Sequence, residues 1–168
     1  MMWNGKYLIW DHIREVLKLN LGLKVACRLT DEHVELSSRS RMKVDLAVQT
    51  LSATNAGLLR HYVAKIYPDA VGTAEFCSIM NKFFDVMNVR NPKETGQKIK
   101  VDSRLYTDIN DERFDWLVNV FLKYFDDWKN KIALIPGLSD TEKEKMRNSC
   151  TVCERWRLLS VSQLLHTG

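Results

Sequence analysis

The sequence has little of what would place the chain in a membrane or outside the cell. No apolar run approaches the roughly 18 residues that a membrane-spanning helix needs. The N-terminus, "MMWNGKYLIWDHIREVLK", lacks the basic region, the long apolar core and the small-residue cleavage site of a signal peptide. There is no internal repeat, no low-complexity tract and no linker rich in proline or serine. We therefore expect a globular protein of the cytoplasm or nucleus that is neither secreted nor bound to a membrane.

The two common phosphate-binding glycine motifs are also missing. The chain contains neither G-x-x-x-x-G-K-[ST] nor G-x-G-x-x-G, and its 7 glycines are scattered. A phosphate site would have to be built differently, for example at a helix N-terminus. The stretch "SSRSRMKV", with Arg39, Arg41 and Lys43, is a candidate. The same residues are equally typical of a basic helix entrance that only keeps the surface soluble.

The cysteines do not form the paired spacing of a zinc module. Cys150 and Cys153 make one C-x-x-C pair, but Cys27 and Cys77 each stand alone. The residues around the pair are also predicted to be helical, where this spacing arises easily. The pattern favours reduced structural thiols over a disulfide, and zinc binding through Cys150 and Cys153 ranks last among the hypotheses.

Length and composition are those of one folded domain. A chain of 168 residues with 45% apolar and 27% charged residues can bury a core without disulfides. The formal net charge of +4, from 25 basic and 21 acidic residues, permits a polyanionic partner without arguing for one.

Apolar residues recurring with the helical period predict an all-α domain of about five helices. The "KVACRLT" stretch is an isolated strand candidate, and residues 93–108 are predicted to be a polar loop. The third helix is predicted to start after Gly72 with Thr73 as its N-cap, and the fifth to open with the Ser139–Glu142 capping box. The predicted helices cover residues 10–19, 41–66, 73–91, 111–134 and 139–165.

The third predicted helix carries two different faces. Its apolar face, predicted to be core, consists of Phe76, Ile79, Met80, Phe83 and Met87. A second ridge, at i, i+3, i+4 and i+7, consists of Asn81, Phe84, Asp85 and Asn88.

An aromatic ring beside an acid and amides can stack on a purine and read guanine, because a carboxylate accepts from N1–H and the N2 amino group together. Adenine has no N1–H, so the mismatch would leave buried polar groups unpaired. The same face is also typical of an ordinary amphipathic helix with a solvated polar side.

Several motifs occur in one order along nearly the whole chain: "WNGKYLIWDHI", "RLTDEHVELSSRSRMKVDLAVQTLS", "GTAEFCSIMNKFFDVMN" and "FLKYFDDWKNKI…PGLSDTEKEKM". Together they resemble the GTP-binding insertion domain of P element transposases and their THAP-domain relatives. The resemblance implies a helical domain inserted in an RNase H-like nuclease fold. It also implies that GTP is bound as a cofactor for assembly with DNA and is not hydrolysed for energy.

The resemblance further implies which residues contact the nucleotide. Arg28 replaces a lysine near the phosphates, Lys43 and Val44 match the start of the phosphate-contacting helix, and Ser52 matches a nucleotide-contacting serine. Lys43 and Ser52 lie on nearly opposite sides of one continuous ideal helix, so they can share a ligand only if Lys43 acts from a frayed helix start or one of them does not touch it.

At the other end of the ligand, the resemblance implies that Phe84 stacks on guanine, that Asp85 reads it and that Asn88 supplies an amide.

These observations predict that residues 1–168 are a GTP-binding insertion domain with an incomplete C-terminal end, separated from its RNase H-like host. The chain shows none of the family's nuclease acids and no THAP zinc module, so we expect a non-enzymatic fragment or remnant. The expected ligands are GTP and, as a further candidate, Mg²⁺. Transposon DNA is expected only in the context of a full transposase, and nuclear localisation follows from the resemblance. The alternative is a helical interaction module that binds no nucleotide and self-associates.

Overall fold

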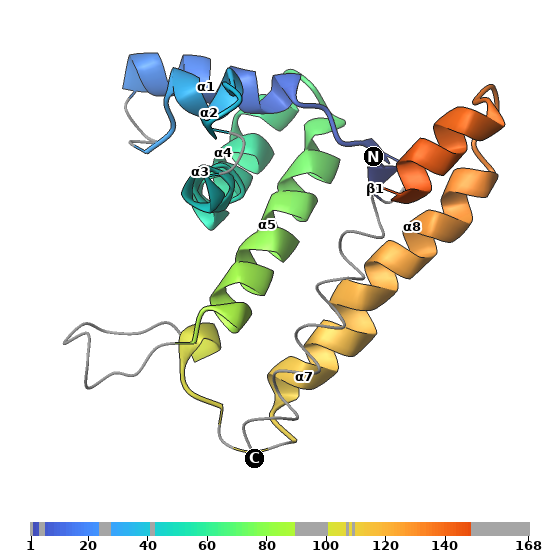
Figure 1. Ribbon diagram of the computed structural model, residues 1–168. Helices are drawn as coiled ribbons and strands as arrows, with labels where there is room; N and C mark the ends of the chain where they lie inside the picture. Colours follow the sequence, from blue (N-terminus) through green and yellow to red (C-terminus); the bar gives the residue numbers. More distant parts are fainter. Residues whose placement is uncertain are drawn as a thin grey trace. The chain divides into compact units, whose positions relative to one another are not determined.

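The computed structural model describes residues 2–3, 6–23, 28–40, 43–89, 101–106, 108 and 110–148. It is predominantly helical, which confirms the predicted fold class (Figure 1). The chain divides into two compact units, Met1–Thr107 and Asp108–Gly168, and each is described separately below. The assignment of residues 1–168 to one insertion domain stays a prediction.

The first unit combines a small hairpin with the helices that form the core. The strands pair antiparallel, with Met2 opposite Tyr7. Of the predicted "KVACRLT" strand, residues 24–27 lie outside the described residues, and residues 28–30 form a turn followed by irregular chain. In chain order the elements are β1 (Met2–Trp3), β2 (Lys6–Tyr7), α1 (Asp11–Leu23), α2 (Asp31–Val34), α3 (Val44–Thr50), α4 (Ala53–His61), η2 (Val63–Lys65), α5 (Ala70–Met87) and η3 (Val101–Ser103).

The long helix predicted over residues 41–66 is broken after Thr50, so that prediction was wrong. Ser52 is the N-cap of α4, and its hydroxyl accepts from the backbone N–H of Asn55 at 3.4 Å. The Asn55 amide group donates to the carbonyls of Gln49 (3.1 Å) and Thr50 (2.9 Å), which satisfies the end of α3. Lys43 and Ser52 therefore precede two different helices, and the argument from a single helical wheel does not apply.

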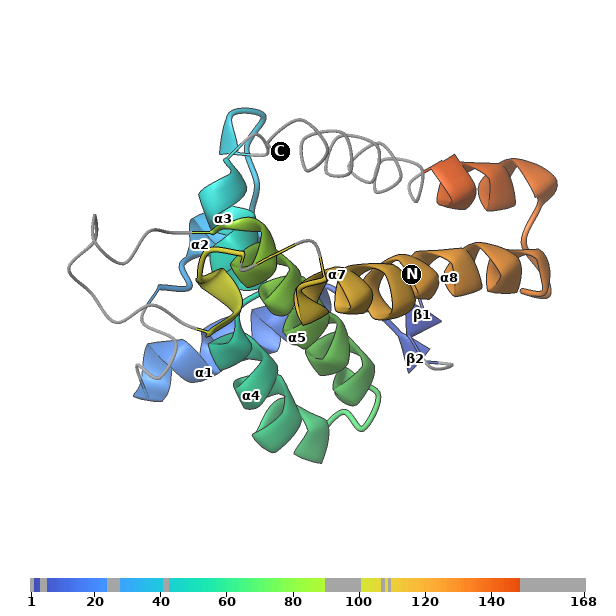
Figure 2. The same ribbon diagram turned by 90° about the horizontal axis from the view of Figure 1, so that it is seen from below.

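The core of the first unit lies between α1, α4 and α5. The helices α4 and α5 pack along one another, and both views show them as neighbours (Figure 1, Figure 2). Small buried side chains of α5 face this contact, which lets the two helices approach closely. The buried cluster consists of Ile13, Val16, Leu17, Leu29, Val34, Ala56, Leu58, Leu59, Val63, Ala70, Ala74 and Cys77.

The helix α5 begins earlier than the sequence predicted. Its N-cap is Asp69, and Thr73 lies inside the helix, where its side chain is buried. The reason is a long-range contact: Nδ1 of the buried His12 lies 2.9 Å from Thr73 Oγ1, and the Ile9 backbone N–H donates to the same oxygen at 3.4 Å. Thr73 is thus used to fasten α1 to α5 rather than to cap a helix.

In the second unit, α7 (Glu112–Trp116) continues through the π-helical segment η4 (Leu117–Leu122) into α8 (Lys123–Ala133). Phe121, Phe125 and Trp128 are buried, whereas Val118 is 57% exposed. A π-helical turn holds an extra residue, which shifts the phase of the side chains before it. The rings of Trp116 and Phe121, five positions apart, accordingly lie 5.9 Å from one another.

Residues 140–148 are helical and begin with the predicted capping box. The Ser139 hydroxyl and backbone N–H both donate to the Glu142 carboxylate, at 2.7 and 2.9 Å. These bonds hold the pKa of Glu142 below its ordinary value. In the part of the chain that the structure describes, no helix is long and apolar enough to span a membrane.

Candidate functional site

One side chain joins the start of α4 to the polar ridge of α5. The Asn81 amide group donates to Asp85 Oδ2 at 2.9 Å, and Asn81 Oδ1 accepts from the Ala53 backbone N–H at 3.0 Å. Asn81 and Asp85 are four positions apart, which places them on the same helix face. Ala53 directly follows the N-cap Ser52. The structure therefore links Asp85, through Asn81, to the residue that follows Ser52, although these residues are far apart in the sequence.

The end of α5 is held by side chains from the segment after it. The last carbonyls of a helix have no partner within the helix. Here the Ser103 hydroxyl donates to the Asp85 carbonyl at 2.9 Å, and the Tyr106 hydroxyl donates to the Val86 carbonyl at 2.8 Å. These bonds fix the turn that carries Asp85 and Asn88. Ser103 and Tyr106 were not predicted to have a role, because they lie in a stretch predicted to be a polar loop.

The aromatic part of the ridge is accessible. Phe84 is half-buried, and its ring lies 5.8 Å from that of Phe83 at an interplanar angle of 56°. Asn88 is exposed and is the C-cap of α5.

The apolar face of α5 that was predicted to be core is only half-buried, so its burial was overestimated. It consists of Phe76, Ile79, Met80, Phe83 and Met87. The fully buried face of α5 instead carries the small residues that pack with α4.

The remaining predicted residues belong to a second group, around α2 and the start of α3. Lys43 precedes α3, and its ammonium group lies 2.8 Å from Glu32 Oε1, with both side chains about half exposed. The hydrogen bond and charge of Lys43 hold the pKa of Glu32 below its ordinary value. Val44 is 66% exposed, and Arg28 and Arg39 are exposed. Arg41 lies outside the described residues.

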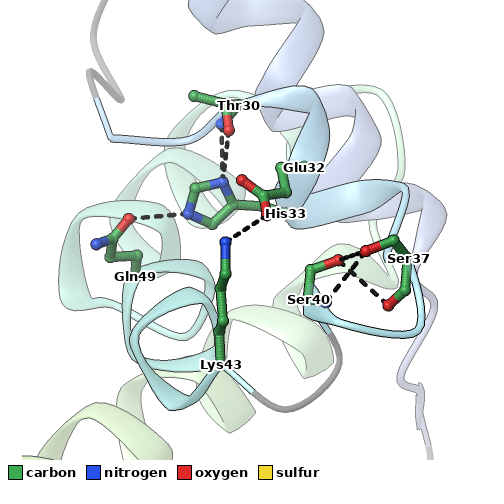
Figure 3. A network of polar contacts seen from close by, with 7 residues as sticks. All are labelled: Thr30, Glu32, His33, Ser37, Ser40, Lys43 and Gln49. Atoms are coloured by element: carbon green, nitrogen blue, oxygen red, sulfur yellow. Dashed lines mark hydrogen bonds and ion pairs between the residues drawn. The ribbon is translucent and has the colours of Figure 1, made fainter.

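A buried histidine fixes α2 against α3, as Figure 3 shows. The Thr30 backbone N–H donates to His33 Nδ1 at 3.1 Å, so Nδ1 is an acceptor and the ring proton is on Nε2. His33 Nε2 then donates to Gln49 Oε1 at 2.9 Å. The loop to Lys43 is closed by Ser37 and Ser40, whose hydroxyls lie 2.7 Å apart. The pair of Glu32 and Lys43 thus sits on a framework of hydrogen bonds.

The described residues offer no alternative metal centre. Among them, no group of three or more His, Cys, Asp or Glu side chains is placed to hold a metal ion. Burial raises the pKa of the Cys77 thiol to about 12, so it is not a thiolate ligand at neutral pH. Cys27, Cys150 and Cys153 lie outside the described residues, and the zinc hypothesis stays a prediction.

The ridge of α5 can bind a planar group that has adjacent N–H donors, through an aromatic face and a carboxylate held at a fixed place. The group around Lys43 can bind an anion, provided that the ammonium group leaves Glu32. Sequence reasoning placed Asn81 on the ridge but not in the site, and it missed Glu32. The i, i+4 spacing of Asn81 and Asp85 was the available signal for the first.

Comparisons with known proteins identify relatives. Residues 1–100 match the family described as TNP-like, GTP-binding insertion domain. The Transposable element P transposase of Drosophila melanogaster is 34% identical over 89 residues, which cover 51% of this chain and 12% of that protein. The structure of the Drosophila P element transposase strand transfer complex matches with a TM-score of 0.59 and 24% identity, over 94% of this chain and 35% of that one. The chain thus spans only a small part of the relatives it matches.

Proposed function

Because the chain belongs to the TNP-like, GTP-binding insertion domain family, we propose that it binds GTP, with the base on the polar ridge of α5 and the phosphates near Lys43. The observation that carries this proposal is the Asn81 bridge, which links Asp85 to Ala53, the residue that follows Ser52. A carboxylate has about four acceptor positions, so Asp85 can accept from a base while it is bonded to Asn81.

In the base half of the proposed site, Phe84 stacks on the purine and Asp85 accepts from guanine N1–H and the N2 amino group. Asn88, exposed at the end of the helix, supplies an amide for the base edge or the sugar. Two hydrogen bonds from the base to one fixed carboxylate discriminate against adenine, because adenine would leave that carboxylate opposite an acceptor.

In the phosphate half, Lys43 supplies the main positive charge, Arg28 a second one and Val44 a backbone and packing contact. Lys43 binds Glu32 in the ligand-free chain, so phosphate binding requires the ammonium group to exchange one anion for another. Ser52, the N-cap of α4, is proposed to contact the nucleotide between the two halves. Mg²⁺ bound to the triphosphate is part of this proposal.

We propose a binding role rather than a catalytic one, with GTP bound and not hydrolysed. A role with transposon DNA in the nucleus is proposed from the relatives and concerns a full transposase that contains such a domain.

The test is calorimetric titration of the chain with GTP, with ATP as the control and Mg²⁺ present. We expect saturable binding of GTP and much weaker binding of ATP. A folded chain that binds neither nucleotide, or binds both equally, would contradict the proposal.

A second candidate is a helical interaction module that binds no nucleotide. It is favoured by three large exposed side chains that flank η2: Tyr62 (45% exposed), Ile66 (69%) and Tyr67 (42%). Apolar groups close together on a surface promote association. Light scattering after size-exclusion chromatography distinguishes the two candidates. Self-association that does not depend on GTP and that Ile66→Asp abolishes would support the second candidate.

A further inference from the structure

We infer that Asn81 is a positioning residue that fixes the Asp85 carboxylate for base recognition and ties it to the start of α4. This inference rests on the proposed function, and it assigns a role to a residue that the predicted nucleotide-binding set does not contain.

The two neighbours of the Asn81 amide determine its orientation. The Ala53 backbone N–H is a donor and must face Oδ1, whereas the Asp85 carboxylate is an acceptor and must face the amide nitrogen. A side chain at this position therefore needs an acceptor and a donor at the two ends of one short planar group. An aspartate would satisfy Ala53 but repel Asp85, and a leucine would satisfy neither.

The bridge connects the start of α4 to Asp85 on α5. The Ser103 hydroxyl holds the Asp85 backbone carbonyl, and a bond to the backbone does not by itself set the side-chain torsions of Asp85. Bidentate recognition of a base requires the plane of the carboxylate to be held within about 0.5 Å and 10–20°. The bond from Asn81 acts on the carboxylate itself and contributes to that restraint, and its strength is increased by the charge of the acceptor.

The same geometry indicates that Asn81 is not mainly a stability residue. The Ala53 N–H belongs to the first turn of α4, and its bond to Asn81 is exposed, so water can replace the amide oxygen there. Removing the bridge should therefore disorder the carboxylate more than it destabilises the fold.

The experiment measures GTP and ATP affinities of Asn81→Ala, with Ser78→Ala as the matched control. Ser78 lies on α5 one turn before Asn81, and its hydroxyl bonds only within the helix, to the Ala74 carbonyl at 3.0 Å. We expect Asn81→Ala to lower the preference for GTP over ATP by roughly tenfold or more, while Ser78→Ala keeps it. An unchanged preference in Asn81→Ala, or an equal loss for both nucleotides, would overturn the inference.

A swapped variant separates positioning from folding. In Asn81→Asp/Asp85→Asn the bridge can form again, because the new carboxylate accepts from both Ala53 and the amide at position 85. We expect the thermal stability of the parent chain and no guanine preference. A swapped chain that still prefers GTP would show that the acid at position 85 does not read the base, and would overturn the inference.

A measurement without nucleotide keeps this inference distinct from the proposed function. Three-bond NMR couplings report whether the first side-chain torsion of Asp85 has one rotamer or several. We expect one rotamer in the parent chain and averaging in Asn81→Ala. Averaging in both chains overturns the positioning role, whereas a single rotamer in a parent chain that fails to bind GTP overturns only the proposed function.

Discussion

The first unit contains two polar networks that are built from different interactions. Around Asn81, an uncharged amide holds a carboxylate through directional hydrogen bonds between α4 and α5. Around Lys43, an ion pair lies half exposed on the surface, above a buried histidine that is fully hydrogen-bonded. The difference matches two kinds of recognition. Reading a base needs fixed directions, whereas attracting a phosphate needs a charge that can change partners.

The largest effect, on GTP affinity, is expected from a substitution of Asp85, the residue of the Asn81 network that is proposed to bind guanine. Asp85→Ala removes both acceptors for guanine, and we expect GTP affinity to fall roughly a hundredfold, about 3 kcal/mol, with ATP affinity little changed. Titration calorimetry measures both. Asp127→Ala, which removes an exposed acid of α8, is the control for net charge. If Asp85→Ala binds GTP as tightly as the parent, the base is read elsewhere.

The buried part of the second network is the next place to test. His33→Leu leaves the Thr30 N–H and the Gln49 side chain without their partner, so we expect the free energy of unfolding to fall by about 2 kcal/mol. Urea denaturation measures this change. The control is His61→Leu, at an exposed position in the last turn of α4. Equal effects of the two substitutions would mean that the His33 network does not hold α2 to α3.

A smaller effect is expected at the start of α4, which belongs to the Asn81 network. Ser52→Ala removes the N-cap of α4, and we expect a loss of about 0.5–1 kcal/mol of stability. The cap bond is long, 3.4 Å, which favours the lower end of that range. Ser52→Asn should restore the thermal midpoint. If Ser52→Ala leaves the thermal midpoint unchanged, the start of α4 is stabilised by the Asn81 bridge and not by the Ser52 cap.

The smallest effect is expected at the surface ion pair. Glu32→Gln leaves Lys43 without its carboxylate partner, so GTP and inorganic tripolyphosphate should bind roughly twofold to fivefold more tightly, and less so in high salt. Glu35→Gln makes the same charge change at an exposed position just after α2. Weaker binding in Glu32→Gln would mean that Glu32 orients Lys43 for the ligand instead of competing with it.

Features that depend on local sequence were predictable. The helical class, the Ser139 capping box and the ridge of Asn81, Phe84, Asp85 and Asn88 all follow from spacings of three and four residues. Each feature needs only neighbours within one or two turns, which a single sequence contains.

Features that depend on distant partners were not predictable. The start of α5 was misplaced because Thr73 is bound by His12, which lies in α1. The end of α5 depends on Ser103 and Tyr106. The break after Thr50 is a different case, because Asn55 is only five residues away, but apolar periodicity does not show where its side chain bonds. The placement of the predicted nucleotide residues came from resemblance, and it remains a proposal.

The small buried side chains of α5 have a consequence for how specificity can change. Ala70, Ala74 and Cys77 set the distance between α4 and α5, and the Asn81 amide must span that distance to reach Ala53. Under the proposed mode of GTP binding, the spacing of the two helices is therefore part of what positions the Asp85 carboxylate. A bulkier residue at position 74, one that touches no ligand, would widen the gap and loosen the carboxylate. Core substitutions that contact no ligand can thus change the proposed preference for GTP over ATP.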